Sequence, residues 1–294
     1  MTATVVRSLR STLRFALILL ALLPVPLRAQ TRTGAPQRIV SLIPATTEML
    51  FAMGAGSRLV GIGNYDHFPP EVEKIVRVGG LLDPNTELLL SLRPDLVLVY
   101  DSQVELKQQL ERAGIPFFNY VHRGLPDVTE TMRALGDRVG ARPGAEAAAA
   151  HIEQRLGAIR ARVAGRPAPR TLLVFGREPG SLRQINASAG VGFLHDVLLL
   201  AGGADVLGDL GKQSAMLSTE MVLARAPEVI IELHYGASLP RESIERERNV
   251  WNALASVPAV RSKKVFLLSG DEFVVPGPRI VLAAEQLANV LHPR

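Results

Sequence analysis

Short runs of apolar and β-branched residues alternate along the chain with longer stretches in which apolar side chains recur every three or four residues. The first pattern is typical of buried strands and the second of amphipathic helices. Strands are therefore expected at residues 38–41, 59–62, 95–100, 116–120, 170–175, 228–233 and 265–269. Helices are expected at residues 46–53, 86–92, 104–113, 128–139, 193–201 and 280–291. This alternation predicts an α/β fold with parallel central sheets flanked by helices.

One long helix interrupts the alternation near the middle of the chain. Pro143 opens an alanine-rich stretch whose apolar positions continue to Val163, and Gly165 and Pro167 end it. About 20 helical residues span roughly 30 Å, which is long enough to join two lobes. We therefore expect two similar lobes with a ligand cleft between them. The expected parts are an N-terminal lobe at residues 38–142, a connecting helix at 143–167 and a C-terminal lobe at 168–292.

A repeated segment supports the similarity of the two lobes. Residues 85–99 match residues 218–232 at a constant offset of 133 positions. Each copy is expected to form a capped short helix, a break before proline and a buried strand. Any helix followed by a strand would share these features, so the pattern also has an ordinary structural explanation. The Thr-Glu pair at residues 86–87 and 219–220 favours true pseudo-symmetry.

The composition of the 294 residues narrows the possible functions. The chain is 47% hydrophobic, 21% charged and 5% aromatic, as in ordinary globular proteins. It has no cysteine, which excludes disulfides, thiolate metal sites, a cysteine nucleophile and a lipidated N-terminal cysteine. The sequence contains no Gly-x-Ser-x-Gly elbow, phosphate-binding loop or His-Glu-x-x-His motif. These observations predict a protein that is not an enzyme and that needs no cofactor or metal of its own.

Residues 1–29 have the pattern of a secretory signal peptide. Arg7, Arg10 and Arg14 accompany an uncharged apolar run at residues 15–27, and these 13 residues are too few to span a bilayer. Of the 33 lysines and arginines, four lie in this segment, which contains no acidic residue. Its removal leaves 29 basic against 28 acidic residues and lowers the net charge from +5 to +1. We therefore expect a periplasmic protein without a lipid anchor that does not bind nucleic acid.

Several stretches carry a recognisable pattern. They are Arg38-Ile-Val-Ser-Leu-Ile-Pro-Ala-Thr-Thr-Glu48, Gly61-Ile-Gly-Asn-Tyr65 with Pro69-Pro70, Leu92-Arg-Pro-Asp-Leu-Val97, Leu223-Ala-Arg-Ala-Pro227 and Pro278-Arg-Ile-Val-Leu-Ala-Ala284. Together they resemble the periplasmic substrate-binding proteins of ABC importers for cobalamin, haem and ferric siderophores, most closely the cobalamin-binding members. The resemblance covers nearly all of residues 38–292 in order and with the spacing of that family.

The resemblance implies that a ligand binds between the lobes and is delivered to a membrane permease. It also implies that one surface glutamate of each lobe docks into arginine pockets of the two permease subunits, and the matching positions are Glu87 and Glu220. A two-fold permease presents the same pocket twice, so a monomeric partner must present the same carboxylate twice. The alternative is that each glutamate only complements the dipole of its own helix.

Candidate ligand-binding residues follow from a rule for α/β lobes, in which ligands bind at loops that leave the carboxyl ends of strands. Such loops provide Pro44, Asn64, Tyr65, Tyr100, Asp101 and His122 in the first lobe, and Arg177, His234, Tyr235, Asp271, Glu272 and Phe273 in the second. The resemblance places Tyr65 and Asp271 at ligand-contacting positions, and Tyr100 where a cobalamin binder has a tryptophan. We expect the ligand to contact Tyr65, Tyr100, Asp271, Phe273, Arg177, Pro44 and Asn64.

Some candidates have other roles open to them. Tyr65 is also suited to a turn, and Tyr100 to the edge of a sheet. Arg177 is suited to bind a ligand carboxylate, or to pair with Glu178 or Glu272. The chain also departs from the cobalamin-binding pattern, with leucines and a glutamate in place of two tryptophans and a valine in place of an arginine. These positions are Leu81, Leu82, Glu272 and Val275. The side chains suited to ligate haem iron are His122, His234 and Tyr235.

The sequence therefore predicts the periplasmic substrate-binding component of an ABC importer, which captures cobalamin or a related corrinoid between its lobes. The alternative cargo is haem or a ferric siderophore. An exported metal-binding protein or a chelatase-like enzyme has the least support, although a fold does not by itself determine function. The expected partners are a metal-chelate small molecule and a dimeric permease of the inner membrane, and the protein itself is expected to be a monomer.

Overall fold

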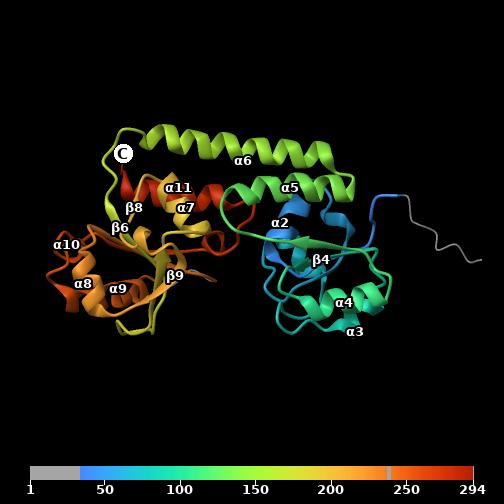
Figure 1. Ribbon diagram of the computed structural model, residues 1–294, viewed down its shortest axis with the longest axis horizontal. Helices are drawn as coiled ribbons and strands as arrows, with labels where there is room; N and C mark the ends of the chain where they lie inside the picture. Colours follow the sequence, from blue (N-terminus) through green and yellow to red (C-terminus); the bar gives the residue numbers. More distant parts are fainter. Residues whose placement is uncertain (1–33, 237–239, 294) are drawn as a thin grey trace, which may run out of the picture. The chain divides into compact units, whose positions relative to one another are not determined.

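A parallel sheet forms the centre of the first half of the chain (Figure 1). The structure is a computed structural model that describes residues 34–236 and 240–293, and the expected signal peptide lies outside these residues. In the described part, five parallel strands pair in the order β3-β2-β1-β4-β5. Their bounds are β1 (Ile39–Ser41), β2 (Leu59–Ile62), β3 (Val76–Arg77), β4 (Leu96–Tyr100) and β5 (Phe117–Tyr120).

Helices cover both faces of this sheet. They are α2 (Pro44–Ala52), α3 (Thr86–Ser91), α4 (Val104–Arg112) and α5 (Pro126–Val139). Apolar side chains of α2 and α5 pack on the face of the sheet that presents Ile39 and Leu98. Those of α3 and α4 pack on the opposite face, which presents Val40 and Val97. Because the central strands are buried on both faces, their sequences are apolar throughout rather than alternating.

The second half contains a mixed sheet with the order β11-β10-β6-β7-β9, and β8 pairs with β6 beside this path. Among the described residues its strands are β6 (Arg170–Gly176), β7 (Ile185–Ala189), β8 (Ala204–Asp205), β9 (Lys212–Leu217), β10 (Val229–His234) and β11 (Val265–Ser269). Its helices are α7 (Phe193–Leu200), α8 (Thr219–Arg225), α9 (Arg241–Val250), α10 (Pro258–Arg261) and α11 (Ile280–Leu291).

The mixed pairing differs from the expectation that both sheets are parallel. Strand β7 runs antiparallel to both β6 and β9, whereas β10 runs parallel to β6 and β11. A parallel crossover needs a dozen or more residues, and only residues 177–184 lie between β6 and β7. Strand β9 is mostly exposed, so its sequence lacks the kind of apolar run that predicted the seven expected strands. The two sheets of mostly parallel strands flanked by helices otherwise agree with the predicted fold class.

A single long helix, α6 (Arg142–Val163), links the two sheets and lies along α5 and α11 (Figure 1). Its buried side chains recur every three or four residues and belong to one apolar core that also includes side chains of both sheets. The helix ends four residues before the expected limit of 167, because Ala164 takes an extended conformation and Gly165 has φ +73°. The division into lobes at residues 38–142 and 168–292 stays a prediction.

Short 3-10 helices connect several of these elements. They are η2 (Gly56–Arg58), η3 (Pro70–Lys74), η4 (Gly208–Leu210), η5 (Trp251–Leu254) and η6 (Asp271–Phe273). The segment that contains η6 joins β11 to α11, and it contributes one wall of the pocket described below.

The repeated segment forms the same local structure twice. The Asn85 side chain accepts a hydrogen bond from the Leu88 amide at 2.9 Å and begins α3. The Ser218 hydroxyl accepts one from the Met221 amide at 3.3 Å and begins α8. Each side chain satisfies an amide that has no partner within its helix.

The equivalence continues beyond the two helices. Arg93 and Ala226, at matching positions, both have positive φ values of 49° and 45°. Such a conformation disfavours residues with a Cβ, so its occurrence in both copies is unlikely by chance. The Arg38 guanidinium also donates to the carbonyl of Leu92 at 2.6 Å, and the Arg170 guanidinium donates to that of Arg225 at 2.6 Å. The two halves therefore share a repeated unit that extends from helix to strand.

Candidate functional site

A pocket of about 330 Å³ lies at the carboxyl ends of the strands of the first sheet. Loops that follow β1, β2 and β3 and the ends of β4 and β5 provide most of its lining, and the segment between η6 and α11 provides the rest. The lining residues are Leu42, Ile43, Pro44, Ala45, Tyr65, Leu81, Tyr100, Tyr120, His122, Val274, Val275 and Pro276. The pocket is thus formed by segments from both halves of the chain.

A larger groove of about 780 Å³ lies elsewhere, between α5, α6 and α7. It is formed by the sides of helices and includes Glu153 and Arg160. Ligands of α/β proteins bind beyond the carboxyl ends of strands, where loops from several strands converge. We therefore assign the candidate site to the smaller pocket, which meets this condition.

Four aromatic rings, those of Tyr65, Tyr100, Tyr120 and His122, lie in the wall of the pocket beside aliphatic side chains. The ring centroids of Tyr100 and Tyr120 are 5.6 Å apart, and those of Tyr120 and His122 are 6.2 Å apart with nearly parallel planes. The His122 ring in turn contacts the edge of Phe193, with centroids 5.4 Å apart. Tyr65 is 70% exposed and lies at the same pocket. These rings provide flat apolar faces together with hydroxyl and imidazole groups.

Charged side chains are absent from the described residues that line the pocket. The Tyr120 hydroxyl and both ring nitrogens of His122 are shielded from solvent, and none of the three has a hydrogen-bond partner among the described residues. Burial lowers the pKa of the His122 imidazole, although the nearby Asp127 and Asp196 carboxylates oppose this shift. Burial also raises the pKa of the Tyr120 hydroxyl. At neutral pH the lining is therefore uncharged.

An ion pair joins the two sides of the pocket. Arg279, which follows the lining segment 274–276, donates from Nε to both oxygens of Glu48 at 3.1 Å and from Nη2 to Oε1 at 2.6 Å. Its guanidinium also lies 4.4 Å from the centre of the Phe68 ring. Burial raises the pKa of Glu48, and the hydrogen bonds from Arg279 partly offset this shift. Glu48 belongs to α2, so the pair holds the lining segment against the helix that begins at Pro44.

Three of the seven expected ligand residues, Pro44, Tyr65 and Tyr100, lie together in this pocket. Asn64 is exposed beside Tyr65 and is not part of the lining. Asp271 does not line the pocket, and it accepts a hydrogen bond from the Gly236 amide at 2.9 Å.

Phe273 is 1% exposed and packs in the apolar core near α11. It is therefore not part of the pocket lining. The neighbouring Val274, Val275 and Pro276 reach the pocket in its place. The turn of η6 decides this outcome, because it directs Phe273 inwards before the chain returns to the pocket.

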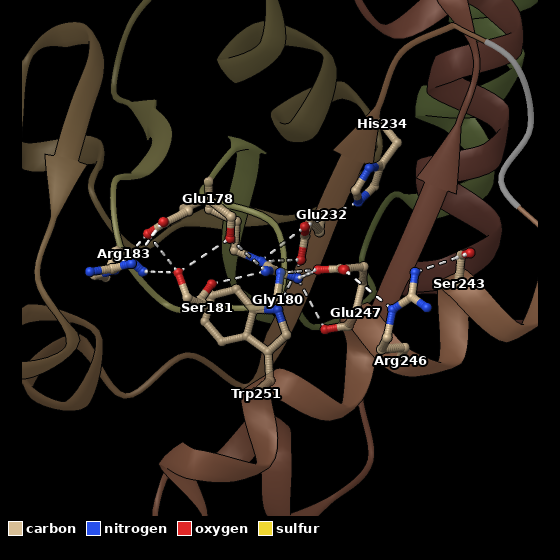
Figure 2. A network of polar contacts seen from close by, with 11 residues as sticks. Glu178, Gly180, Ser181, Arg183, Glu232, His234, Ser243, Arg246, Glu247 and Trp251 are labelled. Atoms are coloured by element: carbon tan, nitrogen blue, oxygen red, sulfur yellow. Dashed lines mark hydrogen bonds and ion pairs between the residues drawn. The ribbon is translucent and has the colours of Figure 1, made fainter.

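Arg177 does not line the pocket, in contrast to the expectation that it binds a ligand carboxylate. Figure 2 shows the polar cluster of Glu232, Glu247 and Trp251 with which its side chain interacts. Its side chain is 1% exposed. Its Nε donates to Glu232 at 3.0 Å and its Nη2 lies 3.0 Å from the Glu247 carboxylate. The indole of Trp251 donates to Glu232 at 2.9 Å in the same cluster. Glu232 lies within the buried strand β10, and a carboxylate there requires a buried cation.

The sequence contained signals for the residues that were missed. Tyr120 ends a predicted strand, so the rule that nominated Tyr100 applies to it equally. Glu232 interrupts an otherwise apolar strand, which indicates a buried ion pair rather than an exposed one for Arg177. His234 donates from Nε2 to the carboxylate of the same glutamate at 3.1 Å, so it lies in this cluster and not in the pocket lining.

The two expected docking glutamates occupy equivalent surface positions. Glu87 lies in the first turn of α3 and Glu220 in the first turn of α8, and both are exposed. The Ser218 side chain lowers the pKa of the Glu220 carboxyl by hydrogen bonding, so this group is negatively charged at neutral pH. No group of three or more metal-ligating side chains and no helix able to cross a membrane occurs within residues 34–236 and 240–293.

A pocket between two α/β halves joined by a long helix, with an uncharged aromatic lining, defines a ligand-binding protein. Residues 39–272 match the family described as Periplasmic binding protein, and the chain belongs to this family. This assignment confirms the resemblance found in the sequence, and a family of binding proteins agrees with the prediction that the chain is not an enzyme.

Several proteins similar to this chain are named as binding proteins. The Vitamin B12-binding protein of Yersinia pestis (strain Pestoides F) is 30% identical over 277 residues, which cover 93% of this chain and 91% of that protein. The periplasmic vitamin B12 binding protein of Vibrio cholerae has a TM-score of 0.75 at 26% identity over 88% of this chain and 97% of its own. A periplasmic heme-binding protein from Roseiflexus sp. RS-1 has a TM-score of 0.72 at 26% identity, covering 87% and 98%.

Proposed function

We propose that this protein is the periplasmic substrate-binding component of an ABC importer, and that it captures cobalamin or a related corrinoid in the pocket between its halves. The observation that carries the proposal is the uncharged aromatic lining, in which Tyr65 and Tyr100 offer flat faces to a macrocycle. The named function of the Yersinia relative supports the same cargo. A pocket of about 330 Å³ takes one edge of so large a ligand, and the exposed Tyr65 contacts the part outside it.

Haem is the second candidate cargo. Two observations favour it. The neutral imidazole of His122 at the pocket has the lone pair needed to ligate iron. The similar protein from Roseiflexus is named as heme-binding. The absence of a cation among the described lining residues weighs against it, because the haem propionates would lose water without gaining a counter-charge.

Titration calorimetry with cyanocobalamin, haem and a ferric siderophore tests the cargo. We expect saturable binding of one cyanocobalamin for each chain, and Tyr100→Ala is expected to weaken it by about tenfold, since an aromatic contact contributes about 0.5–1.5 kcal/mol beyond its buried area. Met216→Ala is the control, because Met216 is exposed on β9 and lies outside the pocket lining. Saturable binding of haem with no response to cyanocobalamin would replace the corrinoid by the second cargo.

The proposal includes delivery to a dimeric permease through Glu87 and Glu220. Their equivalent positions in the two repeated units suit a partner with two identical subunits. We expect Glu87→Ala and Glu220→Ala each to reduce uptake of labelled cobalamin by cells, and the double variant to abolish it, with cargo affinity unchanged. Glu130→Ala, an exposed glutamate of α5 outside the repeat, is the control. Normal uptake by the double variant would refute the docking role.

A further inference from the structure

Resting on the proposed function, we propose that Tyr120 and His122 form the polar end of the pocket and bind an uncharged amide of the cargo. The pocket would thereby select a ligand with a neutral periphery over one that presents carboxylates. Tyr120 was not a candidate from the sequence, and His122 was named there only among the strand-end loops and as a side chain suited to haem iron. The argument has three steps, which concern hydrogen-bonding capacity, charge and desolvation.

The first step is the hydrogen-bonding capacity of the pair. The Tyr120 hydroxyl and the two His122 nitrogens have no partner among the described residues. A phenol both donates and accepts, and a neutral imidazole donates from one nitrogen and accepts at the other. A primary amide also donates and accepts, so it can satisfy both kinds of group. A carboxylate accepts only, and it would leave the accepting nitrogen of His122 without a partner.

The second step is the charge around the pair. The carboxylates of Asp127 and Asp196 are the charged groups that act on His122, and both are negative. Asp127 is paired with the exposed Arg123 at 3.2 Å, and Asp196 accepts a hydrogen bond from the Leu125 amide at 2.8 Å. A ligand carboxylate here would lose its water and meet no counter-charge from the described lining residues.

The third step is that the polar atoms of the pair are shielded from solvent. Tyr120 is 1% exposed, and the ring nitrogens of His122 are shielded from solvent although His122 lines the pocket. A ligand amide reaches them when the His122 ring turns towards the pocket. New hydrogen bonds then form without a further cost of removing water from the protein groups, so they add directly to affinity.

The test compares matched ligands by titration calorimetry on the full-length protein as expressed and purified. One pair is cyanocobalamin and its monocarboxylic acids, in which one side-chain amide is hydrolysed. The other pair is haem and haem whose two propionates have been converted to amides. We expect at least one cobalamin acid to bind about tenfold more weakly than cyanocobalamin, because an unpaired charge costs more than one neutral hydrogen bond.

The variants separate the two side chains from the rest of the pocket. Tyr120→Phe and His122→Phe are each expected to weaken cyanocobalamin binding by about three- to tenfold, the loss of one net hydrogen bond. His122→Gln retains a donor and an acceptor and is expected to stay within about threefold of the wild type. His151→Gln, on the exposed face of α6, is the control. Thermal unfolding of each variant checks that it is folded.

The outcomes distinguish the two proposals. If the wild type binds cyanocobalamin and neither Tyr120→Phe nor His122→Phe changes its affinity, this inference is overturned and the proposed function stands. Tighter binding of haem than of its diamide, with no response to cyanocobalamin, would overturn both. Tighter binding of the diamide than of haem, with no response to cyanocobalamin, would support the inference and overturn the corrinoid cargo.

Discussion

Replacement of Arg177 by methionine distinguishes a structural role of this residue from the ligand-binding role that the sequence suggested. Methionine fills most of the volume of the side chain and removes its charge. The change leaves the carboxylates of Glu232 and Glu247 in place, each 3.0 Å from the guanidinium in the wild type. It also removes the hydrogen bonds that Arg177 donates to the carbonyls of Ser181 and Glu247 at 2.9 and 3.0 Å.

The expected cost follows from the burial of this cluster. Removal of one partner from a buried ion pair costs about 3–5 kcal/mol, because the remaining charge has no compensation. For a domain of this size, 1 kcal/mol lowers Tm by about 2–4 °C, so a decrease of about 6–20 °C is expected. Arg183→Met is the matched control, since Arg183 is largely exposed, its partner Glu178 is partly exposed, and surface pairs contribute about 0–1 kcal/mol.

The pH dependence provides a second readout. Burial alone would raise the pKa of Glu232, but hydrogen bonds from His234 and Trp251 and the charge of Arg177 outweigh it and hold the pKa below its usual value of 4.5. A folded-state pKa below the unfolded value stabilises the fold above pH 4.5, and this contribution is lost as the pH falls through the folded-state pKa. The difference in stability between wild type and Arg177→Met is therefore expected to shrink in acid, where Glu232 becomes protonated.

The assays are thermal and urea unfolding followed by circular dichroism, and calorimetric titration with cyanocobalamin at a temperature where the variant is folded. We expect a lower Tm and a cyanocobalamin affinity within about threefold of the wild type. An unchanged Tm together with loss of binding would refute the reasoning and return Arg177 to the ligand site.

Two further predictions concern groups next to the pocket. Burial raises the pKa of Asp66 to about 7, so the stability of the wild type should fall as the pH rises from about 4 to 7. Asp66→Asn should therefore stabilise the protein above pH 7 by at most about 4 kcal/mol and have little effect near pH 4. Urea unfolding that showed an equal gain at both pH values would contradict this. Arg279→Met should lower the stability of the fold by about 3–5 kcal/mol, because it leaves the buried Glu48 unpaired, and it should weaken cyanocobalamin binding. The control Arg155→Met breaks the more exposed pair with Glu285 and should do neither. Equal Tm values for the two variants would refute this prediction.

Local patterns predicted most of the framework. The seven expected strands all form, and their bounds agree with the sequence within one or two residues because apolar runs and proline breaks act over a few neighbours. The repeat was visible for the same reason, since its caps and its positive-φ positions depend on adjacent residues. Strands β3, β7, β8 and β9 escaped prediction. Strands β3 and β8 are only two residues long, and β7 and β9 depend on pairing partners distant in sequence and not on an apolar run.

The lining of the candidate pocket was predictable where strand ends determine it. Pro44, Tyr65 and Tyr100 follow strands of one parallel sheet, whose carboxyl ends necessarily lie at the same edge. The contribution of the segment 274–276 was not predictable in this way, because the Arg279 to Glu48 pair that holds it connects residues far apart in the chain.

By itself, the sequence determined the α/β class, the long connecting helix and the repeated unit, and it pointed to the edge of the first sheet where the candidate pocket lies. The tertiary structure decided which side chains reach the pocket. Arg177 illustrates the difference, since its partners Glu232 and Glu247 lie 55 and 70 positions away. The free energy of a charged side chain depends on which groups surround it in space, and a linear pattern does not contain that information.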